Sequence, residues 1–177
     1  MTVMGMTLGS PVQITECQNV KNGGIKIYNN NITTPCVQDG WQNYRYEFLP
    51  VKPQVLMLPV DEYPSYVNYP GVWMIEIDGD LESVDIHTWG IEAQGRAFND
   101  LHKKYGKPTS YMTQYVQNRM GAKYKSIIAV WEFKALKVTF YGTTDRLDEG
   151  IIMVRTNKAQ ELFKKVVDEV QQKKKAL

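Results

Sequence analysis

The pattern of apolar and polar positions is clearest around the sequence Asp78-Gly79-Asp80. Residues 72–77 and residues 82–88 alternate in polarity on either side of it, as two strands joined in a β-hairpin do. A turn at Gly79 and Asp80 fills one apolar face, whereas a turn one residue earlier leaves Ile75 facing Glu82. We therefore expect a register that pairs Trp73 with Ile86 and Ile75 with Val84.

Two stretches show the helical period instead. Apolar side chains recur at steps of seven, three and four from residue 91, and Gly106 and Pro108 end the pattern, which predicts an amphipathic helix over about residues 91–105. A second amphipathic helix is expected over about residues 158–173, with Asn157 as its N-cap and Gln160 completing a capping box. Its apolar stripe would hold Ala159, Leu162, Phe163, Val166, Val167 and Val170.

Short strands account for the remaining patterned segments. Residues 1–71 hold seven of the eight prolines, so we expect a turn-rich N-terminal part whose strands lie near residues 25–28, 44–48 and 55–58. Further strands are expected at residues 127–133, 137–141 and 151–154. Residues 72–177 would then form a hairpin, helix, sheet and helix core. The fold class predicted is α+β, with a predominantly antiparallel sheet and two amphipathic helices, as one compact domain. The expected core is a single cluster of Trp73, Ile75, Val84, Ile86, Phe98, Leu101, Trp131, Phe133, Val138 and Phe140.

The charge of the chain is nearly balanced. It has 21 basic and 19 acidic residues, which leaves no overall field to concentrate nucleic acid, so no nucleic-acid partner is expected. No apolar run approaches the roughly 20 residues that span a bilayer, so we expect no membrane insertion of the chain.

The two cysteines indicate the cellular compartment in which the protein resides. Cys17 and Cys36 lie in a polar, turn-rich stretch where burial as free thiols is unexpected, and no histidine stands nearby to suggest metal binding. We expect a Cys17–Cys36 disulfide and hence a periplasmic or secreted protein, whose leader is not part of this chain. The alternative is a cytoplasmic protein with two free thiols.

Residues that could support catalysis are few. His87, Asp85 and Ser83 share one face of a predicted strand, but positions two apart lie about 7 Å from each other, which is too far for the direct hydrogen bonds of a catalytic triad. Metal-ligand spacings and phosphate-binding glycine loops are absent from the sequence. We therefore expect no catalytic residues, no metal ion and no cofactor. An enzyme with a dispersed site near His87 and Asp85 is the rival hypothesis.

Two aromatic segments are the candidate interaction surfaces. Residues 109–126 are long and polar for a connection, which favours either an extended hairpin or a functional loop. Tyrosine, methionine and arginine are enriched at interface cores, and this segment carries Tyr111, Tyr115, Arg119, Met120 and Tyr124. The second candidate carries Tyr63, Tyr66 and Tyr69. In the alternative interpretation these rings only cover the sheet edge or lie flat on the domain.

A resemblance narrows the choice of function. The helix end Leu101-His102-Lys103-Lys104-Tyr105-Gly106-Lys107-Pro108, the strand with Trp131, the sequence Val138-Thr139-Phe140 and a strand led by Gly150 resemble the small envelope proteins of the BamE-like class. The β-lactamase-inhibitor protein shares that fold. The resemblance covers residues 91–156. It implies a molecule whose helices pack on an antiparallel sheet and which binds other proteins without catalysis. We therefore predict a non-catalytic protein-binding module of the bacterial cell envelope, or alternatively an inhibitor or immunity protein that blocks a hydrolase or toxin.

Overall fold

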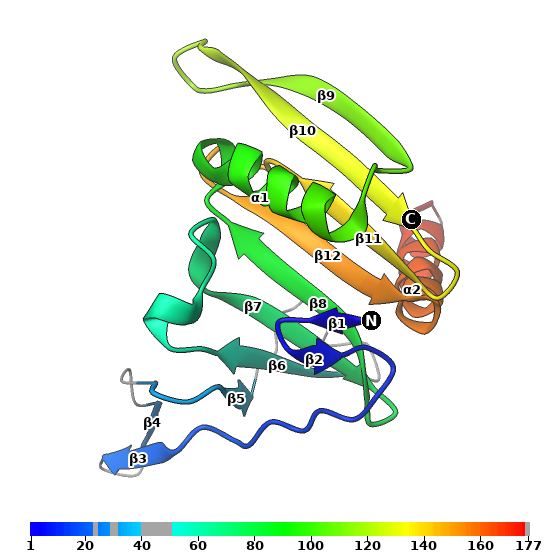
Figure 1. The fold of residues 1–177 in the computed structure, drawn as a ribbon. Coiled ribbons are helices and arrows are strands. Elements are labelled where there is room, and N and C mark those ends of the chain that lie inside the picture. The colour runs from blue at the N-terminus through cyan, green and yellow to red at the C-terminus, as the bar shows by residue number, and fades with distance from the viewer. Residues whose placement is uncertain (23–24, 29–31, 40–50, 176–177) are drawn as a thin grey trace.

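The structure is a computed structural model that describes residues 1–22, 25–28, 32–39 and 51–175 (Figure 1). Its main element is an eight-stranded sheet in which every neighbouring pair is antiparallel. In spatial order the strands are β5 (Cys36–Asp39), β6 (Lys52–Met57), β7 (Val67–Ile77), β8 (Asp80–Thr88), β12 (Gly150–Thr156), β11 (Leu136–Tyr141), β10 (Lys123–Glu132) and β9 (Ser110–Gln117).

Smaller elements complete the chain. Two short hairpins consist of β1 (Thr2–Val3) with β2 (Met6–Thr7) and of β3 (Asn19–Asn22) with β4 (Ile25–Tyr28), and η1 (Val60–Glu62) is a single helical turn. The two helices are α1 (Gly90–Tyr105) and α2 (Asn157–Lys175). The α+β class, the mostly antiparallel sheet and the two helices are thus confirmed. The strand expected at residues 44–48 lies outside the described residues.

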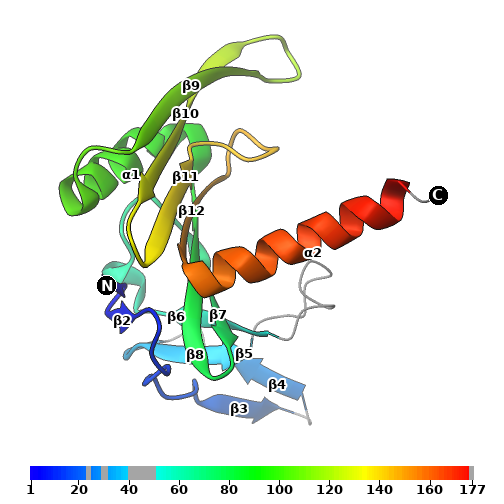
Figure 2. The same ribbon diagram turned by 90° about the vertical axis from the view of Figure 1, so that its right-hand side faces the viewer.

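The helices cover opposite faces of the sheet (Figure 2). Helix α1 carries the chain from the central strand β8 to the outer strand β9, from which β10, β11 and β12 return to pair with β8. Its buried positions Ala93, Ala97 and Leu101 are mostly small, so its axis lies close to the sheet. On the other face, Ala159 of α2 packs with Ile75 and Ile77. The central strands are therefore buried on both sides.

Burial on both sides explains why the predicted hairpin register is wrong. The turn residues are Asp78 and Gly79, which have φ values of 54° and 90°, and an irregularity between Ile75 and Glu76 shifts the pairing. Strand β7 is apolar on both faces, so matching one apolar face could not fix the register. The observed partners are Trp73 with Asp85, Met74 with Val84 and Ile75 with Ser83.

The single predicted core cluster is also wrong in part. Six of the expected residues share the main cluster, namely Val84, Ile86, Leu101, Trp131, Val138 and Phe140, and the half-buried Phe98 packs against it. Trp73 instead packs near the cysteines, Ile75 packs under α2, and Phe133 is 38% exposed. Different elements cover the two faces of the sheet, so the buried apolar residues form separate clusters instead of one.

Helix ends show one further correction. Thr156, not Asn157, caps α2, because the Ala159 N–H donates to the Thr156 hydroxyl at 3.3 Å. At the end of α1, Gly106 has a φ of 78° and its N–H donates to the His102 carbonyl at 2.9 Å, as expected for a glycine that ends a helix.

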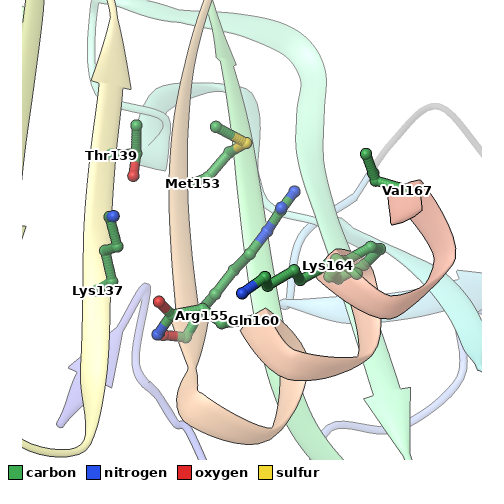
Figure 3. Close-up of a pocket in the computed structure, with 8 residues that line it drawn as sticks. Lys137, Thr139, Met153, Arg155, Gln160, Lys164 and Val167 are labelled. Atoms are coloured by element: carbon green, nitrogen blue, oxygen red, sulfur yellow. The ribbon is translucent and has the colours of Figure 1, made fainter. Parts of the chain in front are cut away.

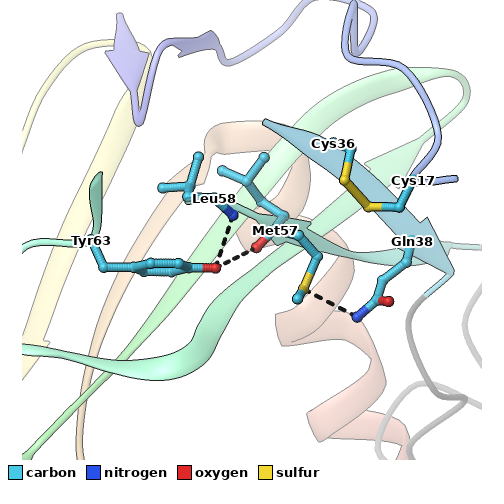
Figure 4. Close-up of a disulfide and its surroundings, with 7 residues drawn as sticks. Cys17, Cys36, Gln38, Met57, Leu58 and Tyr63 are labelled. Carbon is cyan, nitrogen blue, oxygen red and sulfur yellow. Dashed lines mark hydrogen bonds between the residues drawn. A yellow bond between two sulfur atoms is a disulfide. The ribbon is translucent and has the colours of Figure 1, made fainter. Parts of the chain in front are cut away.

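The Cys17–Cys36 disulfide is confirmed (Figure 4). It joins β5 to the segment that lies along the outer edge of this strand. There, the Cys17 N–H donates to the Val37 carbonyl at 2.8 Å, and the Val37 N–H donates to the Thr15 carbonyl at 2.9 Å. The bridge therefore fixes a covering segment over one edge of the sheet.

Candidate interaction surface

Residues 109–126, predicted as an extended hairpin or a loop, belong to an extended hairpin. Strand β9 pairs with β10 over Ser110 to Gln117. Strand β11 pairs with β10 only from Ile128 onward, so the distal half of this β9–β10 hairpin is a two-stranded ribbon. Figure 1 shows this ribbon extending beyond α1. The hairpin thus has a base inside the fold and a projecting distal part.

Aromatic side chains fix the base of the hairpin to α1. The Phe98 ring lies 5.3 Å from Tyr111 and 6.1 Å from Trp131, measured between ring centroids. Tyr105 lies 6.2 Å from Trp131, whose indole N–H donates to the Gly106 carbonyl at 2.8 Å. Burial raises the pKa of Tyr105 to about 12, because the charged phenolate would be poorly solvated there. These contacts give the hairpin a rigid base.

Gln94 of α1 fixes the hairpin further along. Its amide N–H donates to the Lys125 carbonyl at 2.8 Å, and its amide oxygen accepts from the Ile127 N–H at 2.9 Å. Gly142 makes room for this contact, because a Cβ there would come within 2.2 Å of the Gln94 amide oxygen. Sequence reasoning missed Gln94, since a polar residue on a helix gives no signal of a distant backbone partner.

The turn of the hairpin is ordered by its own side chains. The Asn118 carboxamide oxygen accepts from the Met120 N–H at 3.0 Å and from the Ala122 N–H at 2.9 Å. Gly121 supplies a φ of 87° that other residues rarely adopt. This geometry holds Met120 outward, with 90% of it exposed.

Large exposed side chains gather on this ribbon. Exposure is 52% for Tyr111, 75% for Tyr115 and 37% for Tyr124. Met112, which the sequence did not single out, is 54% exposed. Arg119 is exposed in the turn. The predicted residues thus lie on one hairpin, but on both of its faces, because Tyr111 and Tyr115 alternate with Val116, the partner of Tyr124.

The second predicted surface is placed differently. The Tyr63 hydroxyl accepts from the Leu58 N–H at 3.0 Å and donates to the Leu56 carbonyl at 3.2 Å (Figure 4). Tyr66 is half-buried against the core, and burial, followed by the nearby Asp100 carboxylate, raises its pKa. The Tyr69 side chain lies outside the described residues. Tyr63 and Tyr66 lie against the domain, as the alternative interpretation expects.

His87 and Asp85 do not form a shared site. The Ser83 hydroxyl donates to Asp85 at 3.1 Å, so the expectation that these two are too far apart for a direct hydrogen bond is wrong: their side chains lean together along the strand. The Asp85 carboxylate also pairs with the Arg155 guanidinium, with 3.2 Å between Oδ2 and Nη2. The His87 ring instead contacts Glu149, with 2.8 Å between Nδ1 and Oε1. Among the described residues, no group of three His, Cys, Asp or Glu could hold a metal ion.

A concave region lies between the sheet and α2 (Figure 3). Its volume is about 410 Å³. Arg155 lies in it with its guanidinium 4.3 Å from the centre of the Phe163 ring. The lining residues are Lys137, Thr139, Met153, Arg155, Gln160, Phe163, Lys164 and Val167. No local pattern predicts this region, because its residues come from two strands and a helix.

Neither described helix is long and apolar enough to cross a membrane. No protein-family model, no curated protein and no solved structure matches this chain.

Proposed function

We propose that this protein is a non-catalytic protein-binding module and that the β9–β10 hairpin is its binding surface. One observation carries the proposal: Tyr111, Met112, Tyr115, Met120 and Tyr124, all large and exposed, occur within residues 111–124. Side chains of these types bring large contact areas and are enriched at interface cores. A partner protein would cover them.

The anchoring of the hairpin supports the same function. A projecting element binds tightly when little conformational freedom remains to be lost, and this hairpin is held by Gln94, Trp131 and its ordered turn. A rigid, aromatic projection also suits an inhibitor or immunity protein that inserts into the cleft of a hydrolase or toxin. That role is the second candidate.

The cell envelope is the proposed location. The Cys17–Cys36 disulfide supports an oxidising compartment such as a periplasm, since cytosolic thiols are kept reduced. The resemblance of residues 91–156 to BamE-like envelope proteins supports the same location and a partner that is a protein. An enzyme is a less supported alternative, because His87 and Asp85 have separate partners.

Affinity capture from a bacterial envelope extract tests this proposal. The wild-type chain is one bait, and a triple variant with Arg119, Met120 and Tyr124 changed to alanine is the other. We expect the variant to lose at least about 2 kcal/mol of binding free energy, roughly a thirtyfold change in affinity, with its melting temperature nearly unchanged.

A matched control removes exposed apolar side chains elsewhere. Val60→Ala and Val167→Ala act at positions that are 71% and 52% exposed and lie off the hairpin. This double variant should capture the partner as the wild type does. Equal capture by all three baits would exclude the turn of the hairpin from the binding surface.

A further inference from the structure

Among the residues that the structure describes, none covers the outer edge of β9. Within the described part of the chain, only β10 hydrogen-bonds to the backbone of β9, so the outward N–H and C=O groups of β9 are free to pair. Natural proteins usually block such an edge with charged side chains, proline, bulges or a very short strand. Strand β9 has eight residues, Ser-Tyr-Met-Thr-Gln-Tyr-Val-Gln, and none is charged, proline or glycine.

We propose that β9 pairs antiparallel with β9 of a second copy of this chain, so that one continuous sheet runs through both copies. The pairing uses the backbone edge of residues 110–116 with the Tyr111 and Tyr115 side chains, and it leaves the turn at residues 118–122 and Tyr124 free for a partner protein. The inference therefore goes beyond the proposed function and does not require it.

Symmetry sets the register of this pairing. A two-fold axis perpendicular to the sheet leaves every side chain on the same face of the sheet. Directly opposite residues of two paired strands also share a face, so each residue of one β9 must lie opposite a residue an even number of positions away in the other β9. An axis at Thr113 places Tyr111 of each copy opposite Tyr115 of the other copy, which gives two tyrosine pairs. Aromatic pairs and threonine pairs are among the favourable cross-strand contacts. An axis at Gln114 would separate these tyrosines.

Charge favours a second copy as the occupant. In a two-fold contact, a strand meets itself, so a charged residue near the axis would face or neighbour its own duplicate. Strand β9 meets this requirement, because the charged residues of the hairpin lie in the turn, at Arg119, or on β10, at Lys123, Lys125 and Glu132. Tyr115, which is 75% exposed, is available to cross to the second copy.

Sedimentation over a concentration series of the full chain tests the proposal. We expect a reversible monomer–dimer equilibrium. Thr113→Lys places two like charges opposite each other at the axis and should weaken dimerisation at least tenfold, whereas Thr113→Val should retain the dimer. Tyr115→Ala is a second variant at an exposed site that should fold normally, and it should also weaken the dimer.

Several outcomes would overturn the pairing. A wild-type chain that stays monomeric up to its solubility limit would do so, as would a dimer that neither Thr113→Lys nor Tyr115→Ala weakens. A stronger effect of Gln114→Lys than of Thr113→Lys would contradict the register. A monomer that still captures a protein from envelope extract would refute self-pairing and leave the proposed function intact.

Discussion

The two outer edges of the sheet are built in opposite ways. Strand β5 has four residues, and the segment around Cys17 covers its outer edge through backbone hydrogen bonds to Val37 and a disulfide to Cys36. Strand β9 has eight residues and no such cover among the described residues. An exposed strand edge is a template for pairing with another chain. The comparison shows one edge closed against association and the other left open to it.

The open edge is not a loosely held part of the fold. Trp131, Phe98 and Gln94 fix the β9–β10 hairpin from its inner side, through α1. At β5 the fixing elements lie on the outside, where they also block the edge. The described residues therefore stabilise both ends of the sheet, but at β9 they leave the outward backbone groups uncovered.

The largest expected effect concerns the inner anchor of the open edge. Trp131 is 1% exposed. Changing it to alanine should lower the free energy of unfolding by about 3–5 kcal/mol, because the substitution leaves a cavity and removes the hydrogen bond from the indole N–H to the Gly106 carbonyl. Phe133→Ala, at a residue that is 38% exposed, should cost much less. Urea denaturation of both variants checks this, and equal losses would show that the buried Trp131 ring is no more important to stability than the half-exposed Phe133 ring.

A smaller effect is expected at the closed edge. Changing Cys17 and Cys36 together to serine releases a bridge that spans 19 positions and should destabilise the protein by roughly 3 kcal/mol in the chain-entropy model. The same variant should expose the Val37 amide to exchange, since its covering segment is no longer held. Thiol titration of denatured, unreduced wild-type protein supplies the control: two reactive thiols per chain would refute the bridge.

Local patterns predicted the elements well and their packing less well. The helical periods at residues 91–105 and 158–173 correspond to α1 and α2, and the polarity of residues 109–126 was compatible with the hairpin that they form. The cysteine pair was predicted from the polar sequence around it, but the premise that this stretch is not buried was wrong: both cysteines are buried, beside Val55 and Met57. The register of β7 could not be predicted, since a strand buried on both faces offers no single apolar side to match.

Some features of the candidate interaction surface could be predicted from the sequence, and others could not. Tyr111, Tyr115, Arg119, Met120 and Tyr124 could be named from composition, because interface residue types stood out in a segment without apolar periodicity. The contact between Gln94 and β10 spans more than 30 positions and leaves no trace in the sequence. The open edge of β9 was equally hidden, because strand order in a sheet depends on contacts between distant segments.

Amide hydrogen exchange of the two edge strands tests the central contrast most directly. The Val37 amide should be protected at every protein concentration, since it donates to the Thr15 carbonyl. The outward amides of β9 should exchange quickly in dilute protein and become protected as the concentration rises and dimers form. Slow exchange of those β9 amides in dilute, monomeric protein would show that this edge is already covered and would contradict the account.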